Sequence, residues 1–173
     1  MNESINNFRP TFALYHASPR GTGSAVKMSL HPAHGTVDGC IAVTIANQMT
    51  IGDATKPQPV YPRFGFDNAT SVNLDFNDLC KVLQVFRGEC ESIEDGKGIF
   101  HCSASGTTKI NLRHVIDPVC GYSFEIHHNI RGSGEERSHR FFFNSAEACG
   151  LTEAISTVMG FVVFGVPVVH PHE

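Results

Sequence analysis

Ten histidines among 173 residues are the first candidates for metal or acid–base chemistry in this chain. Three local clusters occur: His31 with His34, His127 with His128, and His170 with His172. Neighbouring residues on a strand point to opposite faces, so the central pair cannot bind one metal ion. The first pair falls in an expected loop without a carboxylate at a recognised ligand spacing, and the last pair lies in a short tail. The pattern therefore indicates solvated or hydrogen-bonded histidines and no metal or other cofactor.

Nucleophilic catalysis has equally little support in the residue spacing. The chain contains no Gly-x-Ser-x-Gly elbow, and none of its six cysteines forms a Cys-x-x-Cys pair. The glycine-rich stretches 21–23 and 95–98 lack the strand–loop–helix order, with a Lys-Ser/Thr pair, of a phosphate-binding loop. We therefore expect reduced cysteines and a protein that is not an enzyme.

The outward positions of the expected strands are more informative, because they combine cations, amides and aromatic rings. If Val26, Met28 and Leu30 face a core, the residues between them face solvent, and the same alternation applies around Ile110 and Leu112. In such a set Lys and Arg neutralise phosphates, Tyr and Phe stack unpaired bases, and Ser and Asn add hydrogen bonds. The candidate nucleic-acid-binding residues are Tyr15, Arg20, Lys27, Ser29, Lys109, Asn111, Arg113, Arg140 and Phe142.

Strands must position these side chains, and alternating apolar residues predict about eight of them. The expected strands cover residues 8–16, 24–31, 40–48, 71–76, 99–104, 107–116, 122–130 and 137–143. Within them, Phe76 is expected to face the core and Gln48 the solvent. Amphipathic helices are expected at 77–94 and 145–164, and an exposed, proline-rich loop at 50–64. This order predicts an α+β fold in a single domain, 1–173, with a core of about 8–166 and short tails.

Both helices carry a start signal. Asn77 supplies an N-cap for the first, and Asn144 with Glu147 forms a capping-box-like start for the second. The second helix has a near-heptad apolar seam that continues into an end that is apolar on nearly all sides. Such an end is typical of burial by a partner subunit, so we expect a homo-oligomer, with a tetramer as the leading assembly. The expected interface consists of Leu151, Ile155, Val158, Phe161, Val162 and Phe164.

Bulk composition narrows the class of protein. The formal net charge of −4 argues against a strongly electrostatic binder, but the acids concentrate in residues 67–95 and leave the rest nearly balanced. No apolar run approaches the roughly 20 residues needed to cross a bilayer. The N-terminus lacks the basic and apolar regions of a signal peptide. We expect a cytoplasmic protein without membrane contact.

Several stretches resemble the Whirly family of single-stranded DNA-binding proteins across residues 12–165. They are FALYH, PRFGFDNATSVNLDFNDLCKVLQ, FRGECESIEDGKG and SAEACGLTEAISTVMGFVVFGVP. The family's basic K-G-K-A-A-L motif is absent; the equivalent region, SPRGTGSAVKMSL, has Arg20 and Lys27 as its cations. The resemblance implies two four-stranded antiparallel sheets packed roughly perpendicular, with assembly into tetramers through the helices. It also implies binding of single strands between sheets with little sequence preference, and guide-RNA-binding proteins share the architecture.

The leading hypothesis is a non-catalytic protein that binds single-stranded DNA, with RNA left open, on or between its sheet faces. If DNA is the ligand, the protein is expected to be associated with the nucleoid. Two alternatives stay open. The acidic stretch 67–95 favours a protein-interaction or structural module on the same fold. An enzyme or small-ligand receptor would use histidines such as His31, His34 or His114.

Overall fold

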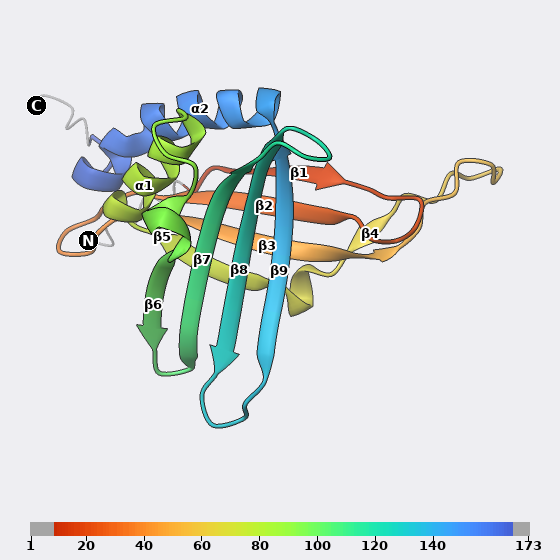
Figure 1. Cartoon of the computed structure of the whole chain (residues 1–173), viewed down its shortest axis with the longest axis horizontal. Coiled ribbons are helices and arrows are strands. Elements are labelled where there is room, and N and C mark those ends of the chain that lie inside the picture. Colours follow the sequence, from red (N-terminus) through yellow and green to blue (C-terminus); the bar gives the residue numbers. More distant parts are fainter. Residues whose placement is uncertain (1–8, 168–173) are drawn as a thin grey trace, which may run out of the picture.

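The computed structural model describes residues 9–167, which form two crossed antiparallel sheets with two α-helices along one side. In Figure 1 the strands β1–β3 run across the view and β7–β9 run down it, while α1 and α2 lie together at the top. The expected strand start at Phe8 lies outside the described residues. So do the tail histidines, His170 and His172.

The first sheet is built around one long central strand. Its members are β1 (Thr11–His16), β2 (Ser24–His31), β3 (Cys40–Thr50), β4 (Arg63–Phe64) and β5 (Thr70–Leu74). The order is β1-β2-β3, and β3 then pairs with β5 along residues 41–45 and with the short β4 at its far end. The sheet therefore has the four expected strands plus one two-residue strand. Between β3 and β4 the chain extends away from the body as an arm (Figure 1).

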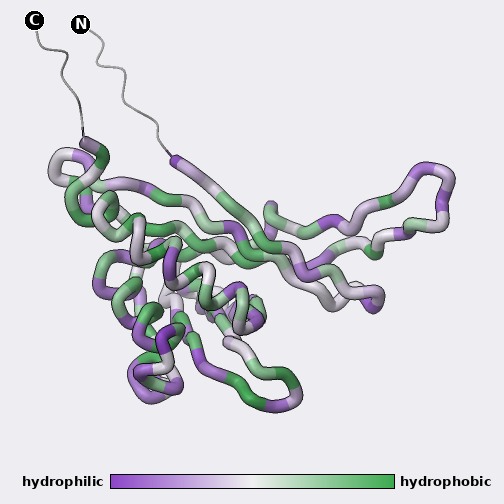
Figure 2. Tube along the Cα trace, turned by 90° about the horizontal axis from the view of Figure 1, so that it is seen from above, coloured by the Kyte–Doolittle hydropathy of each residue, from purple (hydrophilic) through white to green (hydrophobic). Residues whose placement is uncertain are grey.

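The second sheet is a meander in the order β6-β7-β8-β9. Its strands are β6 (Ile99–Ser103), β7 (Gly106–Val115), β8 (Gly121–Ile130) and β9 (Glu136–Asn144). Buried and more exposed residues alternate along much of β7, β8 and β9. The strands of the first sheet run across Figure 2, where green and purple segments also follow one another. One face of each sheet is consequently apolar, and these two faces pack on each other and on the helices to form one core.

Several expectations about this core are confirmed. Val26 and Val43 of the first sheet and Ile110 of the second are fully buried, as are Phe141 and Phe143 of β9. Two side-chain directions were wrong. Gln48 is buried, because its side-chain amide holds the turn between β1 and β2 through bonds to the Ser18 and Gly23 backbone. Phe76 is 44% exposed, because the helix has already begun there.

Helix α1 (Phe76–Phe86) is shorter than expected and begins earlier. Its N-cap is Asp75 rather than Asn77: the Asp75 side chain accepts from the Asp78 backbone N–H, and the Asp78 side chain accepts from the Asp75 N–H. The helix ends before Gly88, which adopts a φ of 72° that favours glycine. The chain then runs beside β7, where Glu91 accepts a hydrogen bond from the His114 backbone.

Two short 3-10 turns, Phe66–Asn68 and Ile93–Gly96, complete the connections around α1. The second contains Glu94 and Asp95 in left-handed conformations, with φ of 50° and 52°. Residues 87–92, which the sequence pattern placed in the helix, form an irregular connection to this turn.

Helix α2 (Ser145–Phe164) matches its expected bounds, and its capping box is confirmed. The Asn144 side chain accepts from the Glu147 N–H, and Glu147 accepts from the Asn144 N–H. Among the described residues, α2 is the one helix long and apolar enough to cross a membrane. This corrects the expectation that no apolar run approaches that length. In the structure its inner stripe is buried by the chain's own core, beginning at Ala148.

A partly buried histidine, His139, joins the two sheets and makes stability depend on pH. His139 Nδ1 of β9 lies 3.0 Å from Thr70 Oγ1 of β5. Burial, and secondarily the nearby Arg137, lowers the pKa of His139 below its ordinary value of 6.5. As pH falls below that value the unfolded chain binds a proton that the folded chain does not, so the free energy of unfolding falls.

Between pH 7.5 and pH 5.5, we expect the free energy of unfolding to decrease less in His139→Gln than in the unsubstituted protein. Urea denaturation at both pH values measures this decrease. An equal decrease in both proteins would contradict the assignment.

Candidate functional site

Five of the candidate residues share the outer face of the second sheet, which we call the sheet-2 face. Strand register places Glu125 between Asn111 on one side and Arg140 on the other. The remaining members alternate with buried core residues on the same strands: Phe100 on β6, Lys109 and Arg113 on β7, His127 on β8, and Phe142 on β9. The sequence pattern placed Lys109, Asn111 and Arg113 outward and Arg140 on one face with Phe142, and strand register unites the five on this face. Phe100, Glu125 and His127 were not among the candidates.

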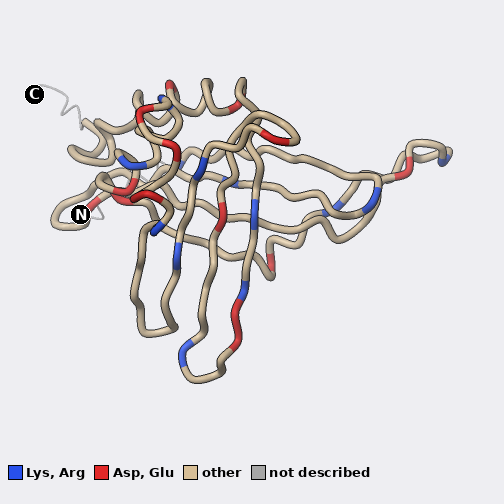
Figure 3. Tube along the Cα trace, in the orientation of Figure 1, with Lys and Arg blue, Asp and Glu red and all other residues tan. Residues whose placement is uncertain are grey.

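The charge pattern of the sheet-2 face is cations around one central carboxylate. Arg113 Nη2 lies 3.6 Å from Glu125 Oε1, and His127 Nε2 lies 3.5 Å from Glu125 Oε2. Figure 3 shows this arrangement as blue segments on β7 and β9 flanking a red segment on β8. Because the Arg113 contact is longer than an ordinary hydrogen bond, the guanidinium is only loosely held by the carboxylate. It retains the capacity to bind a further anion.

Two aromatic rings lie on the sheet-2 face beside the cations, one exposed and one partly exposed. Phe100 is 58% exposed, and Lys109 Nζ lies 5.4 Å from its ring centroid. The ring of Phe142 lies at the other end of the face, against the backbone of Gly121. Asn111 lies against Gly98, the residue before β6, and its Oδ1 is a buried oxygen without a hydrogen-bond partner among the described residues. A sheet face with a ring on each edge strand and cations between them can stack bases and neutralise phosphates.

The outer face of the first sheet carries a second, smaller cluster, which we call the sheet-1 face. Tyr15 is 58% exposed, and its ring lies 5.4 Å from Phe64 and 6.5 Å from Phe66. Lys27 Nζ lies 5.2 Å from the centroid of the Phe66 ring. Tyr15 and Lys27 were predicted. Phe64 was missed because it was assigned to the loop 50–64, and Phe66 because it fell in no expected element. Their signal in the sequence is the Arg-Phe-Gly-Phe run that follows the last proline of the arm.

The two other candidates of the first sheet contribute less. Ser29 Oγ lies 2.8 Å from Thr11 Oγ1, so its hydroxyl already has a partner. Arg20 lies in the turn between β1 and β2, where its backbone N–H donates to Ser18 Oγ. The sheet-1 and sheet-2 faces both point away from the shared core. The nine candidate residues therefore form two separate surfaces on one chain.

Two histidines, His16 and His101, join helices to strands. His16 Nε2 lies 2.7 Å from Glu147 Oε1 and joins β1 to α2, and His101 Nε2 lies 2.8 Å from Asp78 Oδ2 and joins β6 to α1. Across residues 9–167, no group of three or more His, Cys, Asp or Glu side chains is close enough to hold a metal ion. These two pairs correspond to the hydrogen-bonded histidines that the sequence pattern indicated.

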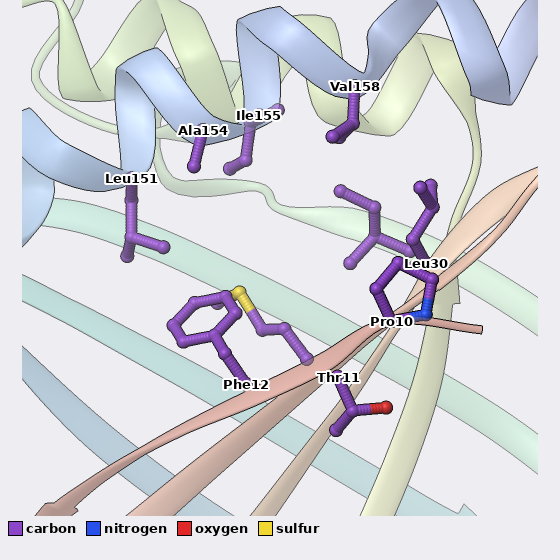
Figure 4. Close-up of a pocket in the computed structure, with 10 residues that line it drawn as sticks. Pro10, Thr11, Phe12, Leu30, Leu151, Ala154, Ile155 and Val158 are labelled. Atoms are coloured by element: carbon purple, nitrogen blue, oxygen red, sulfur yellow. The ribbon is translucent and has the colours of Figure 1, made fainter. Parts of the chain in front are cut away.

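The apolar surface of α2 differs from the expected interface. Leu151, Ile155 and Val162 are 3–4% exposed, so this part of the seam is the chain's own core rather than a free surface. Phe164 is 86% exposed, and Val158 is partly exposed. Between α2 and the start of β1 lies an apolar groove of about 190 Å³ (Figure 4). Figure 4 shows its walls: Ala154 and Val158 on the helix, opposite Pro10 and Phe12.

Comparisons with known proteins support the fold. No protein-family model and no curated protein sequence matches the chain. Among solved structures it is similar to WHY1 and WHY3 from Arabidopsis thaliana. For WHY1 the identity is 14%, the TM-score is 0.68, and 91% of this chain and 86% of that chain are covered. For WHY3 the values are 13%, 0.69, 90% and 89%.

A guide-RNA-binding protein complex bound to a guide RNA is also similar. Its identity is 15% and its TM-score is 0.57, and the match covers 90% of this chain and 92% of that one. This chain therefore has the Whirly fold. The predicted fold class, two crossed antiparallel sheets with two main helices, is confirmed.

Proposed function

We propose that this protein binds single-stranded nucleic acid without catalysis, with single-stranded DNA as the first candidate and RNA as the second. The observation that carries the proposal is the sheet-2 face, where Lys109, Arg113 and Arg140 surround a strip between two aromatic rings. The similarity to a guide-RNA-binding protein complex adds support from the fold. Structural similarity to a nucleic-acid-binding complex also supports a non-enzymatic role for this chain.

The chemistry of the face favours single strands over a duplex. Phe100 and Phe142 can stack only on bases whose faces are open, and a duplex hides those faces within its own stack. The cations supply a sequence-independent attraction for phosphates. Glu125 in the centre repels phosphates, so the phosphates of the strand would lie over the cations and the bases against Phe100 and Phe142 at the two ends of the face.

We also propose a homo-oligomer, with a tetramer as the leading assembly. The exposed end of α2 at Phe164 and the groove between Val158 and Phe12 leave apolar surface that a second copy could cover. Assembly would place the sheet faces of neighbouring subunits side by side and so extend the path of a bound strand. A cytoplasmic location, nucleoid-associated for a DNA-binding role, completes the proposal.

The test is a fluorescence titration with single-stranded and duplex DNA and RNA of equal length, each at low and at high salt. We expect tighter binding of the single strands, and an affinity that falls steeply as salt rises. The same samples in light scattering would report the mass of the assembly. Equal affinity for single strands and duplexes, or no binding at low salt, would overturn the proposed function. A monomer at micromolar concentration would overturn the oligomer alone.

A further inference from the structure

A cysteine and a histidine form a pair at the end of the second sheet that the proposed function does not use. Cys120 lies in the connection between β7 and β8, and its Sγ is 3.6 Å from Nε2 of His114 on β7. Ser145, the first residue of α2, donates from its hydroxyl to the same sulfur at 3.9 Å. Both Cys120 and His114 are exposed, so a small molecule can reach the sulfur.

The three side chains have complementary roles in thiol chemistry. A thiolate, not a thiol, is the nucleophile, and a histidine within hydrogen-bond reach can take the thiol proton. The His114 ring packs on Tyr122 with 5.0 Å between ring centroids, which holds its Nε2 toward the sulfur. The hydroxyl of Ser145 and the N-terminal end of the α2 dipole favour negative charge on the sulfur.

From this geometry we propose that Cys120 is a reactive thiol that forms mixed disulfides with low-molecular-weight disulfides such as oxidised glutathione. The reaction would not require the proposed nucleic-acid binding. In the reaction His114 takes the proton of Cys120, and the thiolate attacks one sulfur of the disulfide. A new sulfur–sulfur bond forms to Cys120 as the old one breaks. The leaving thiolate then takes the proton from His114 and departs as a thiol.

Other cysteines of the chain provide internal controls. Cys102 and Cys149 are exposed as Cys120 is, yet among the described residues neither has a hydrogen bond to a histidine. Cys40 is less exposed, and burial, with a smaller contribution from Asp75, raises its pKa. If exposure alone set reactivity, Cys120 and the two other exposed cysteines would react at similar rates.

The experiment measures the rate of each cysteine separately in the full-length protein. The protein is incubated with oxidised glutathione, quenched at intervals by alkylation, and analysed by peptide mass spectrometry. We expect Cys120 to react about 10-fold faster than Cys102 and Cys149, and Cys40 to be slower still. Equal rates at Cys120 and Cys102 would overturn the proposal.

A substitution separates the role of the histidine from that of exposure. We expect His114→Gln to lower the Cys120 rate about 10-fold while leaving the Cys102 rate unchanged. An unchanged Cys120 rate in this variant would overturn the pairing. If the variant does not fold, which circular dichroism would reveal, the comparison of cysteines within the unsubstituted protein still decides the proposal.

Discussion

Replacing Lys109, Arg113 and Arg140 together with glutamine is expected to reduce affinity for a single-stranded oligonucleotide by two to three orders of magnitude at about 0.05 M salt. Each phosphate contact on a single strand contributes about 0.7 to the slope of log affinity against log salt. Loss of three contacts should therefore lower the slope by about 2 as well. Fluorescence titrations at several salt concentrations give both quantities.

The matched control removes the same formal charge from the helix side of the molecule. Lys81, Arg87 and Lys97 belong to α1 and the segment that follows it, and Lys81 is paired with Glu94 at 2.9 Å. Their joint replacement by glutamine changes the net charge by the same three units but removes no cation from either sheet face. We expect its affinity to remain close to that of the unchanged protein. An equal loss in both triple variants would mean that net charge, not the sheet-2 face, controls binding.

Phe143→Ala is expected to be the most destabilising single substitution considered for this protein. The Phe143 ring is fully buried and lies 5.7 Å from Phe86 of α1, 4.8 Å from Phe141 and 6.4 Å from Phe124. Removing it leaves a cavity between the second sheet and a helix, which should lower the free energy of unfolding by about 3–5 kcal/mol. Urea denaturation followed by circular dichroism measures this difference.

The control for this prediction is Phe164→Ala, the same substitution at a residue that is 86% exposed. In the monomer, Phe164→Ala should change the free energy of unfolding by less than about 0.5 kcal/mol. Its effect should instead be seen in light scattering, as weaker self-association. Equal destabilisation by the two substitutions would show that Phe143 does not hold the core together in the way its ring contacts indicate.

Local patterns explain which parts of the structure were predictable. The start of α2 was correct because the two partners of its capping box, Asn144 and Glu147, are three residues apart and need nothing else. The start of α1 was wrong because Asp75, Asn77 and Asp78 are all competent capping residues close together. Only the reciprocal bonds between Asp75 and Asp78 distinguish them.

The missed site residues share a different cause. Phe64 follows the arm and reaches Tyr15 across 49 positions of the sequence, a contact that no periodic pattern reveals. Glu125 matters because strand register sets it between Asn111 and Arg140, which come from the strands on either side. The number and order of neighbouring strands had to be known before this carboxylate could be placed among the cations.

By itself the sequence determined the alternation that separates inner from outer strand positions, and with it the α+β order of elements and the core at residues such as Val26 and Ile110. These features depend on residues close together in the chain, where a period of two or of 3.6 positions is enough. Only the tertiary structure decided that the candidate binding residues lie on two faces, and that Leu151 and Ile155 belong to the chain's own core. The division into two faces and the burial of these α2 residues depend on how the sheets cross and where α2 packs. Both are determined by contacts between residues far apart in the sequence, which a local pattern does not reveal.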